Sequence, residues 1–178
     1  MSYVQNQPRR AYDHFYALKE ARDDLLGYAL FDRLELPEGV RDGLVEHTWR
    51  RREFENYFCT REVLLRWTEA ACDEHLGPLF VEGWRQAMEE SITDIDSAMA
   101  TLGRGSPWSE DSKVSSDFLE PLFEAFFTRV GLPNLMKKSD YHKLARHMQR
   151  DDIDSEVSAV LDQIQETVSR ARSQSLPT

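Results

Sequence analysis

Apolar residues follow two patterns along the chain, first the short runs typical of strands and later the spacing of helices. Residues 26–32 are almost continuously apolar and end on an acid, and residues 44–49 form a second, shorter apolar segment. Short apolar runs bounded by charged or turn residues favour buried strands. We therefore expect strands at 26–32 and 44–49, and a further short strand at 3–6 that Pro8 ends.

A helix is predicted before the first long strand, and a turn is predicted after it. Apolar residues recur at intervals of three and four from Ala11 to Leu25, which predicts a helix over residues 11–24. The tripeptide Pro37-Glu38-Gly39 is a turn signal between the two longer strands.

Helical spacing dominates from residue 60 onward. Thr60 is suited to cap the first helix of this region, which Gly77-Pro78 interrupts. The clearest helical pattern runs from Phe80 to Leu102, and Gly103 is placed to end it. Three further helices are expected, with the caps Ser116, Ser139 and Asp154.

These elements predict an α-rich α/β fold, with a small parallel sheet of two or three strands followed by a helical C-terminal cap. In the last helix we expect a buried face made of Val157, Leu161, Ile164 and Val168. Residues 173–178 are expected to fray. We expect residues 1–58 and residues 59–178 to form one structural domain, the second segment packed on the first.

The charge of the chain restricts its partners. The 178 residues carry a net charge of −10, so the average surface repels nucleic acid and anionic membranes. No stretch approaches the roughly 18 apolar residues of a membrane span, and the N-terminus lacks an apolar signal core. Cys59 and Cys72 match no metal-ligand spacing and are expected to be reduced thiols. We therefore expect a cytoplasmic protein without membrane contact.

Two local groups of basic residues are candidates for nucleic-acid contact despite the overall charge. Arg50, Arg51 and Arg52 follow the second long strand and are suited to bind a phosphate backbone, although a charge run is also typical of a solvated surface. The second group consists of Lys137, Lys138, Lys143 and Arg146. Its alternative role is to dock on an acidic surface of the same protein, at Asp151, Asp152 or Asp154.

Acidic residues stand near the ends of both long strands. Ligands of open α/β sheets bind beyond the carboxyl ends of the strands, and carboxylates there suit Mg²⁺ or Mn²⁺. Asp32 and Glu35 are candidate metal ligands, and Glu53 and Glu55 are candidate catalytic residues. The alternatives are that Asp32 caps a turn and that Glu53 opens a helix, where a negative charge is favourable.

Two strings of residues bear on the family of this chain. They are Gly27-Tyr28-Ala29-Leu30-Phe31-Asp32-Arg33 and Trp49-Arg50-Arg51-Arg52-Glu53-Phe54-Glu55-Asn56-Tyr57-Phe58. Together with Pro107-Trp108-Ser109 and Leu132-Pro133-Asn134, they resemble the C-terminal Toprim region of overcoming-lysogenization-defect-type (OLD-type) ATP-dependent endonucleases. Those proteins are ATPases with an appended Toprim nuclease domain, often used in defence against phage. The resemblance covers most of the chain from about residue 11.

The resemblance implies a nuclease-associated domain that acts with DNA and with an ATPase domain or subunit. The chain departs from the Toprim pattern in two ways. The strand that delivers the catalytic glutamate is expected before Met1, and Asp32-Arg33-Leu34 stands where an Asp-x-Asp string is expected. Leucine cannot ligate a metal, so we expect the isolated chain to be inactive. The alternative is a non-catalytic helical module that uses an open strand edge to dock a partner or to self-associate.

Overall fold

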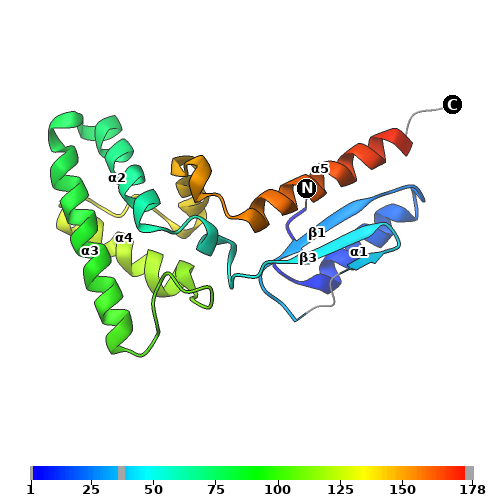
Figure 1. Ribbon diagram of the computed structural model, residues 1–178, viewed down its shortest axis with the longest axis horizontal. Coiled ribbons are helices and arrows are strands. Elements are labelled where there is room, and N and C mark those ends of the chain that lie inside the picture. Colours follow the sequence, from blue (N-terminus) through cyan, green and yellow to red (C-terminus); the bar gives the residue numbers. More distant parts are fainter. Residues whose placement is uncertain (1, 36–38, 175–178) are drawn as a thin grey trace. The chain divides into compact units, whose positions relative to one another are not determined.

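The computed structural model describes residues 2–35 and 39–174, which form two compact units (Figure 1). The first unit consists of Met1–Arg50 and Asp154–Thr178, and the second of Arg51–Ile153. The chain therefore leaves the first unit after Arg50 and returns to it at Asp154. This division differs from the expected segments 1–58 and 59–178, because the last helix belongs with the sheet.

A mixed three-stranded sheet forms the centre of the first unit, with the strand order β1-β3-β2. β1 (Gly27–Phe31) pairs in parallel with β3 (Leu44–Thr48), so the two strands predicted at 26–32 and 44–49 are confirmed. β2 (Gly39–Arg41) pairs antiparallel with β3. The expectation of a purely parallel sheet is therefore wrong.

The antiparallel pairing originates in the turn Asp42-Gly43. Both residues have positive φ, at 48° and 88°, and a two-residue turn with this backbone joins antiparallel strands. Arg41 and Leu44 face each other directly across the turn. Of the turn predicted at 37–39, residues 37 and 38 lie outside the described residues, as do residues 175–178 of the tail that is expected to fray.

One face of the sheet packs on α1 (Pro8–Lys19), which is shorter than the helix predicted over 11–24. The shared apolar cluster consists of Ala11, Phe15, Ala29, Phe31 and Leu44. A Cβ atom at Gly27 would lie 2.7 Å from the ring of Phe15, so the absence of a side chain allows this close approach. The strand predicted at 3–6 is not formed, because Gln5 and Asn6 form a turn with φ values of 54° and 53°.

The opposite face of the sheet packs on α5 (Ser155–Gln174) (Figure 1). Side chains of a strand alternate between faces, so Tyr28 points away from α1, and its hydroxyl donates a 2.8 Å hydrogen bond to Gln163 of α5. Asp154 caps this helix as predicted, since its Oδ1 accepts a 2.9 Å bond from the backbone N–H of Glu156.

The buried face of α5 differs from the predicted one. Leu161 and Val168 are 58% and 45% exposed, whereas Val160 and Thr167 are buried. The hydroxyl of Thr167 donates a 2.8 Å bond to the carbonyl of Gln163, which satisfies the polar group and allows its burial. The buried side of α5 therefore includes Val160 and Thr167 in place of Leu161 and Val168.

The second unit is built of helices and short helical turns. They are η1 (Phe54–Tyr57), α2 (Arg61–Leu76), η2 (Pro78–Phe80), α3 (Val81–Thr101), the π-helical η3 (Ser115–Leu119), α4 (Glu120–Arg129), η4 (Lys138–His147) and η5 (Arg150–Asp152). The α-rich character of the prediction is confirmed. Thr60 caps α2 as expected, because its hydroxyl oxygen accepts a 3.2 Å bond from the N–H of Val63.

Aromatic rings fill the core of the second unit. Trp67 of α2 meets Phe123 of α4 edge to face, with ring centroids 5.1 Å apart, and Trp84 of α3 meets Phe126 in the same way at 5.4 Å. The helix predicted after Ser139 is the 3₁₀-helix η4, whose three residues per turn place the buried residues Tyr141 and Leu144 on one side. No helix in the described ranges is long and apolar enough to cross a membrane.

Candidate functional site

The parallel pair β1–β3 brings the residues after both strands to one edge of the sheet. The N–H of Trp49 donates a 3.0 Å bond to the carbonyl of Phe31, and Arg33 Nη1 lies 3.3 Å from the carbonyl of Arg50, to which it donates. Asp32 directly follows β1. This edge therefore gathers Asp32 with two arginines, and we call it the carboxyl edge.

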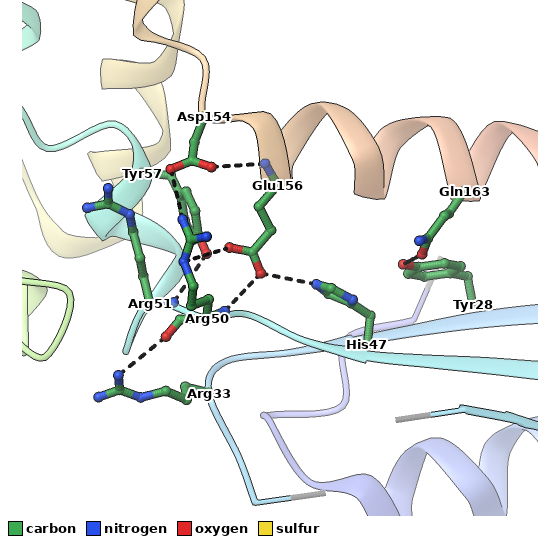
Figure 2. A network of polar contacts seen from close by, with 9 residues as sticks. All are labelled: Tyr28, Arg33, His47, Arg50, Arg51, Tyr57, Asp154, Glu156 and Gln163. Carbon is green, nitrogen blue, oxygen red and sulfur yellow. Dashed lines mark hydrogen bonds and ion pairs between the residues drawn. The ribbon is translucent and has the colours of Figure 1, made fainter. Parts of the chain in front are cut away.

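Two acids at the start of α5 hold Arg50 at the carboxyl edge (Figure 2). Arg50 Nη2 lies 3.3 Å from Asp154 Oδ2 and its Nε lies 3.9 Å from Glu156 Oε2. The backbone N–H of Arg50 donates a 2.9 Å bond to Glu156 Oε1, and His47 Nε2 lies 3.4 Å from the same oxygen. The arginine predicted to bind phosphate thus already meets two carboxylates and ties β3 to α5.

The predicted metal ligands occupy different environments. Asp32 is half-buried, and its backbone N–H donates a 2.8 Å bond to Asn6 Oδ1. Glu35 is exposed and lies three residues further along the chain. Within residues 2–35 and 39–174, no group of three His, Cys, Asp or Glu side chains is arranged to hold a metal ion. An Mg²⁺ or Mn²⁺ site that uses Asp32 and Glu35 stays a prediction.

Glu53, a predicted catalytic residue, begins η1 in the second unit. Its Oε2 accepts a 2.9 Å bond from the backbone N–H of Ser115, and its Oε1 accepts a 3.0 Å bond from the Ser115 hydroxyl. Its own N–H donates to Asn56 Oδ1 at 3.0 Å, completing a capping box. Both carboxylate oxygens therefore serve to fasten η1 to the start of η3.

The neighbours of Glu53 also contact the loop before η3 or the turn η1. Arg52 donates from its N–H to Glu110 O at 2.8 Å and from Nη1 to Asp111 O at 3.1 Å. The guanidinium of Arg51 lies 5.3 Å from the centre of the Tyr57 ring (Figure 2). Glu55 is half-buried, and its carbonyl accepts a 2.9 Å bond from the N–H of Cys59.

These contacts assign the predicted residues to two units. Asp32, Glu35 and Arg50 belong to the first unit, whereas Arg51, Arg52, Glu53 and Glu55 belong to the second. The run Arg50–Arg52 is therefore divided, and each arginine in it has its own contacts.

The second basic group lies at η4. Lys137, Lys138 and Arg146 are exposed, and Lys143 Nζ lies 2.8 Å from Asp140 Oδ1. The bond from this ammonium group lowers the pKa of the Asp140 carboxyl.

The acids considered as internal partners of that basic group have other contacts. Asp152 pairs with Arg66 of α2, and Asp154 pairs with Arg50. Arg66 also donates from Nε to the carbonyl of His147 at 2.7 Å, which fixes the end of η4 on α2.

A buried acid that the sequence reasoning missed lies on β3. The side chain of Glu46 is 2% exposed and shares the α1 face of the sheet with Leu44. The hydroxyl of Tyr12 donates to Glu46 Oε1, and Arg41 Nε lies 3.3 Å from Oε2. The bond to Glu46, with burial, raises the pKa of Tyr12. The sequence could have indicated this residue, because Glu46 lies two positions after Leu44 in a predicted strand and therefore shares its core-facing side.

A groove of about 660 Å³ lies in the first unit between β1 and α5. Its apolar lining includes Leu25, Leu26, Ile164 and Val168, and Arg22 and Arg172 lie among its charged residues. β1 is an edge strand of the sheet. Gly27 and Phe31 bond toward β3, so by alternation the N–H and C=O of Leu30 are directed away from it.

Polar groups in both units therefore mainly join one segment to another, while the groove of the first unit combines an apolar lining with an open strand edge. Compared with protein-family models, with curated proteins and with solved structures, this chain matches none.

Proposed function

We propose that this protein is a non-catalytic binding module that docks an extended segment of a protein partner along β1, against α5. The observation that carries the proposal is the groove between these two elements, which lies beside the edge strand of the sheet. A peptide that adds a strand gains affinity from main-chain hydrogen bonds and specificity from pockets for alternate side chains. The first requirement has a counterpart on β1 beside this groove, and the second has one in the lining of the groove.

Leu30 lies on β1 two residues beyond Tyr28, which lines the groove, and its backbone supplies the first requirement. Its N–H and C=O are directed away from β3 and its side chain is 36% exposed. The second is supplied by Ile164 and Val168 of α5, which are suited to contact apolar side chains of the added strand. Arg172 at the same groove favours an acidic residue in the partner segment.

The contacts of Glu53, a predicted catalytic residue, and of Arg50, a predicted nucleic-acid-binding residue, support a role in holding the fold. Both carboxylate oxygens of Glu53 accept bonds from Ser115, and Arg50 lies between Asp154 and Glu156. A carboxylate whose two oxygens both accept bonds inside the fold has fewer lone pairs open to a metal ion or to a proton from a substrate.

A displayed library of random peptides tests this proposal. The purified protein should enrich extended apolar peptides that carry an acid, and two variants, Val168→Asp and Leu30→Pro, should bind the enriched peptides at least about ten-fold more weakly. Leu102→Asp is the matched control, because Leu102 is 67% exposed and lies in the second unit. Enriched peptides that bind both groove variants as they bind the natural chain would refute the proposal.

A second candidate function is a Toprim-like, nuclease-associated domain of an OLD-type ATP-dependent endonuclease. The observation that favours it is the carboxyl edge, where Asp32 lies with Arg33 and Arg50 beyond a parallel pair of strands. In this proposal Mg²⁺ or Mn²⁺ binds Asp32 and Glu35, and an ATPase domain or subunit supplies what the isolated chain lacks. Incubation with DNA and Mn²⁺ should then give no cleavage by the chain alone. Robust cleavage that Asp32→Ala abolishes would instead identify an active nuclease and displace the binding module.

A further inference from the structure

The junction of α2 and α3 presents an apolar surface, which we call the tip. It consists of Leu76, Leu79 and Phe80, which are 47%, 87% and 52% exposed. Gly77, with a φ of 87°, and Pro78 form the turn between the two helices (Figure 1). Single exposed apolar residues are ordinary, but here three large ones lie within five positions at one turn, and clustered exposed apolar residues are typical of interaction sites.

Acidic residues flank the tip on both sides in the sequence. Asp73 and Glu74 at the end of α2 and Glu82 in the first turn of α3 are all exposed. No lysine or arginine occurs between Asp73 and Trp84. A complementary surface therefore has to offer an apolar contact together with positive charge.

A surface with both properties exists on the same unit, and we call it the basic segment. It consists of Leu135, Lys137, Lys138 and Arg146. Leu135 is 55% exposed and Met136 is buried, so the chain directs Leu135 outward beside the two lysines. Within the described ranges, no acidic side chain forms an ion pair with Lys137, Lys138 or Arg146. The segment thus pairs an exposed leucine with uncompensated positive charge.

We infer that the tip of one copy of this chain docks on the basic segment of a second copy. The tip and the basic segment are both exposed in one copy, so they do not cover each other within it. Leu79 and Phe80 then contact Leu135, while Glu82 and its acidic neighbours face Lys137 and Lys138. This contact is independent of the groove in the first unit and goes beyond the binding function proposed above.

The contact joins two different surfaces of the chain. Two copies that dock reciprocally, tip to basic segment in both directions, close into a symmetric dimer. Copies that dock in one direction only keep an unused tip and an unused basic segment, and such an assembly extends into a chain or closes into a larger ring. Because opposite charges contribute, association weakens as salt rises.

Sedimentation velocity of the full chain over a range of concentrations tests the apolar part of the contact. We expect the mean mass to rise with concentration and to fall at high salt. The double variant Leu79→Ser, Phe80→Ser should remain a single chain, and Leu102→Ser should associate as the natural chain does. Leu102 is exposed to a similar degree and lies at the other end of α3. A natural chain that stays monomeric at every concentration, or a double variant that associates normally, would overturn the inference.

Charge reversal tests the electrostatic part and controls for loss of folding. Glu82→Lys and Lys138→Glu should each weaken association about ten-fold, because each places like charges in contact. An equimolar mixture of the two variants should recover association, since the altered tip of one matches the altered basic segment of the other. Failure of the mixture to recover would contradict the pairing. Loss of DNA-duplex binding by Lys138→Glu, with self-association unchanged, would assign the basic segment to nucleic acid instead.

Discussion

Replacing Tyr12 with phenylalanine removes the hydroxyl that donates to the buried carboxylate of Glu46. A hydrogen bond to a charged group contributes about 1.5–3 kcal/mol, and the loss leaves Glu46 with Arg41 as its nearby charged partner. Arg41 is half exposed, so its ion pair contributes no more than about 1 kcal/mol. We therefore expect Tyr12→Phe to destabilise the first unit by about 2 kcal/mol.

Hydrogen–deuterium exchange of peptides from β3 measures this loss directly in the first unit. A loss of about 2 kcal/mol corresponds to exchange roughly 30-fold faster for amides that exchange through opening of the whole unit, under conditions in which the unit closes again faster than an open amide exchanges. Glu46→Gln provides the matched background, because glutamine keeps the shape and an acceptor while the charge is removed. In that background Tyr12→Phe should cost only about 1 kcal/mol, the contribution of a neutral hydrogen bond. Equal costs in both backgrounds would refute the claim that the tyrosine satisfies a buried charge.

Three further outcomes follow from contacts within single units. Glu53→Ala should destabilise the second unit by about 1–3 kcal/mol, because the N–H and hydroxyl of Ser115 lose their acceptors. In thermal melts its melting temperature should fall further than that of Glu53→Gln. Gly27→Ala should cost about 1–3 kcal/mol in urea unfolding, since its Cβ would lie 2.7 Å from the ring of Phe15; an unchanged midpoint would contradict that packing. Burial raises the pKa of Tyr141 to about 12. The stability that its protonated hydroxyl contributes is therefore complete below pH 10 and is lost as the pH rises toward 12. Tyr141→Phe should remove this part of the alkaline decline in melting temperature in a pH series of melts.

The strands and helices with strong apolar patterns could be predicted because the spacing of apolar residues within each segment indicates which element it forms. β1, β3 and α2 follow this rule, and the caps Thr60 and Asp154 act through bonds only two or three residues long. β2 was not predicted from the sequence, because it has only three residues and its Val40 is 65% exposed. The Asp-Gly pair that follows β2 favours a hairpin turn, so it could have indicated a strand on each side of it.

The apolar pattern of α5 did not predict which of its residues are buried. Hydrophobicity favours Leu161 over Thr167, yet the helix buries the threonine, whose hydroxyl bonds to the preceding turn. The stripes 157, 161, 164, 168 and 157, 160, 164, 167 both have helical spacing, so tertiary contacts decide between them. The sequence alone contains no such contacts.

The roles of the candidate site residues depended on contacts between distant segments. Glu53 is fastened by Ser115, which lies 62 positions further along the chain, and Arg50 by acids more than 100 positions away. Such separations leave no periodic signal. The carboxylate of Glu53 therefore looked available for chemistry in the sequence, although the fold bonds both of its oxygens to Ser115.

The passage of the chain out of the first unit after Arg50 and back at Asp154 has a consequence for how this protein can change. Arg50 Nη2 lies 3.3 Å from Asp154 Oδ2, so the chain leaves and re-enters the first unit within the reach of one arginine–aspartate ion pair. A connection of a few residues could bridge this distance while the sheet kept both of its covering helices. Residues 51–153 could thus be replaced, enlarged or deleted as one segment in evolution. The sheet and its two covering helices, which come from the segments on either side, would still pack on each other.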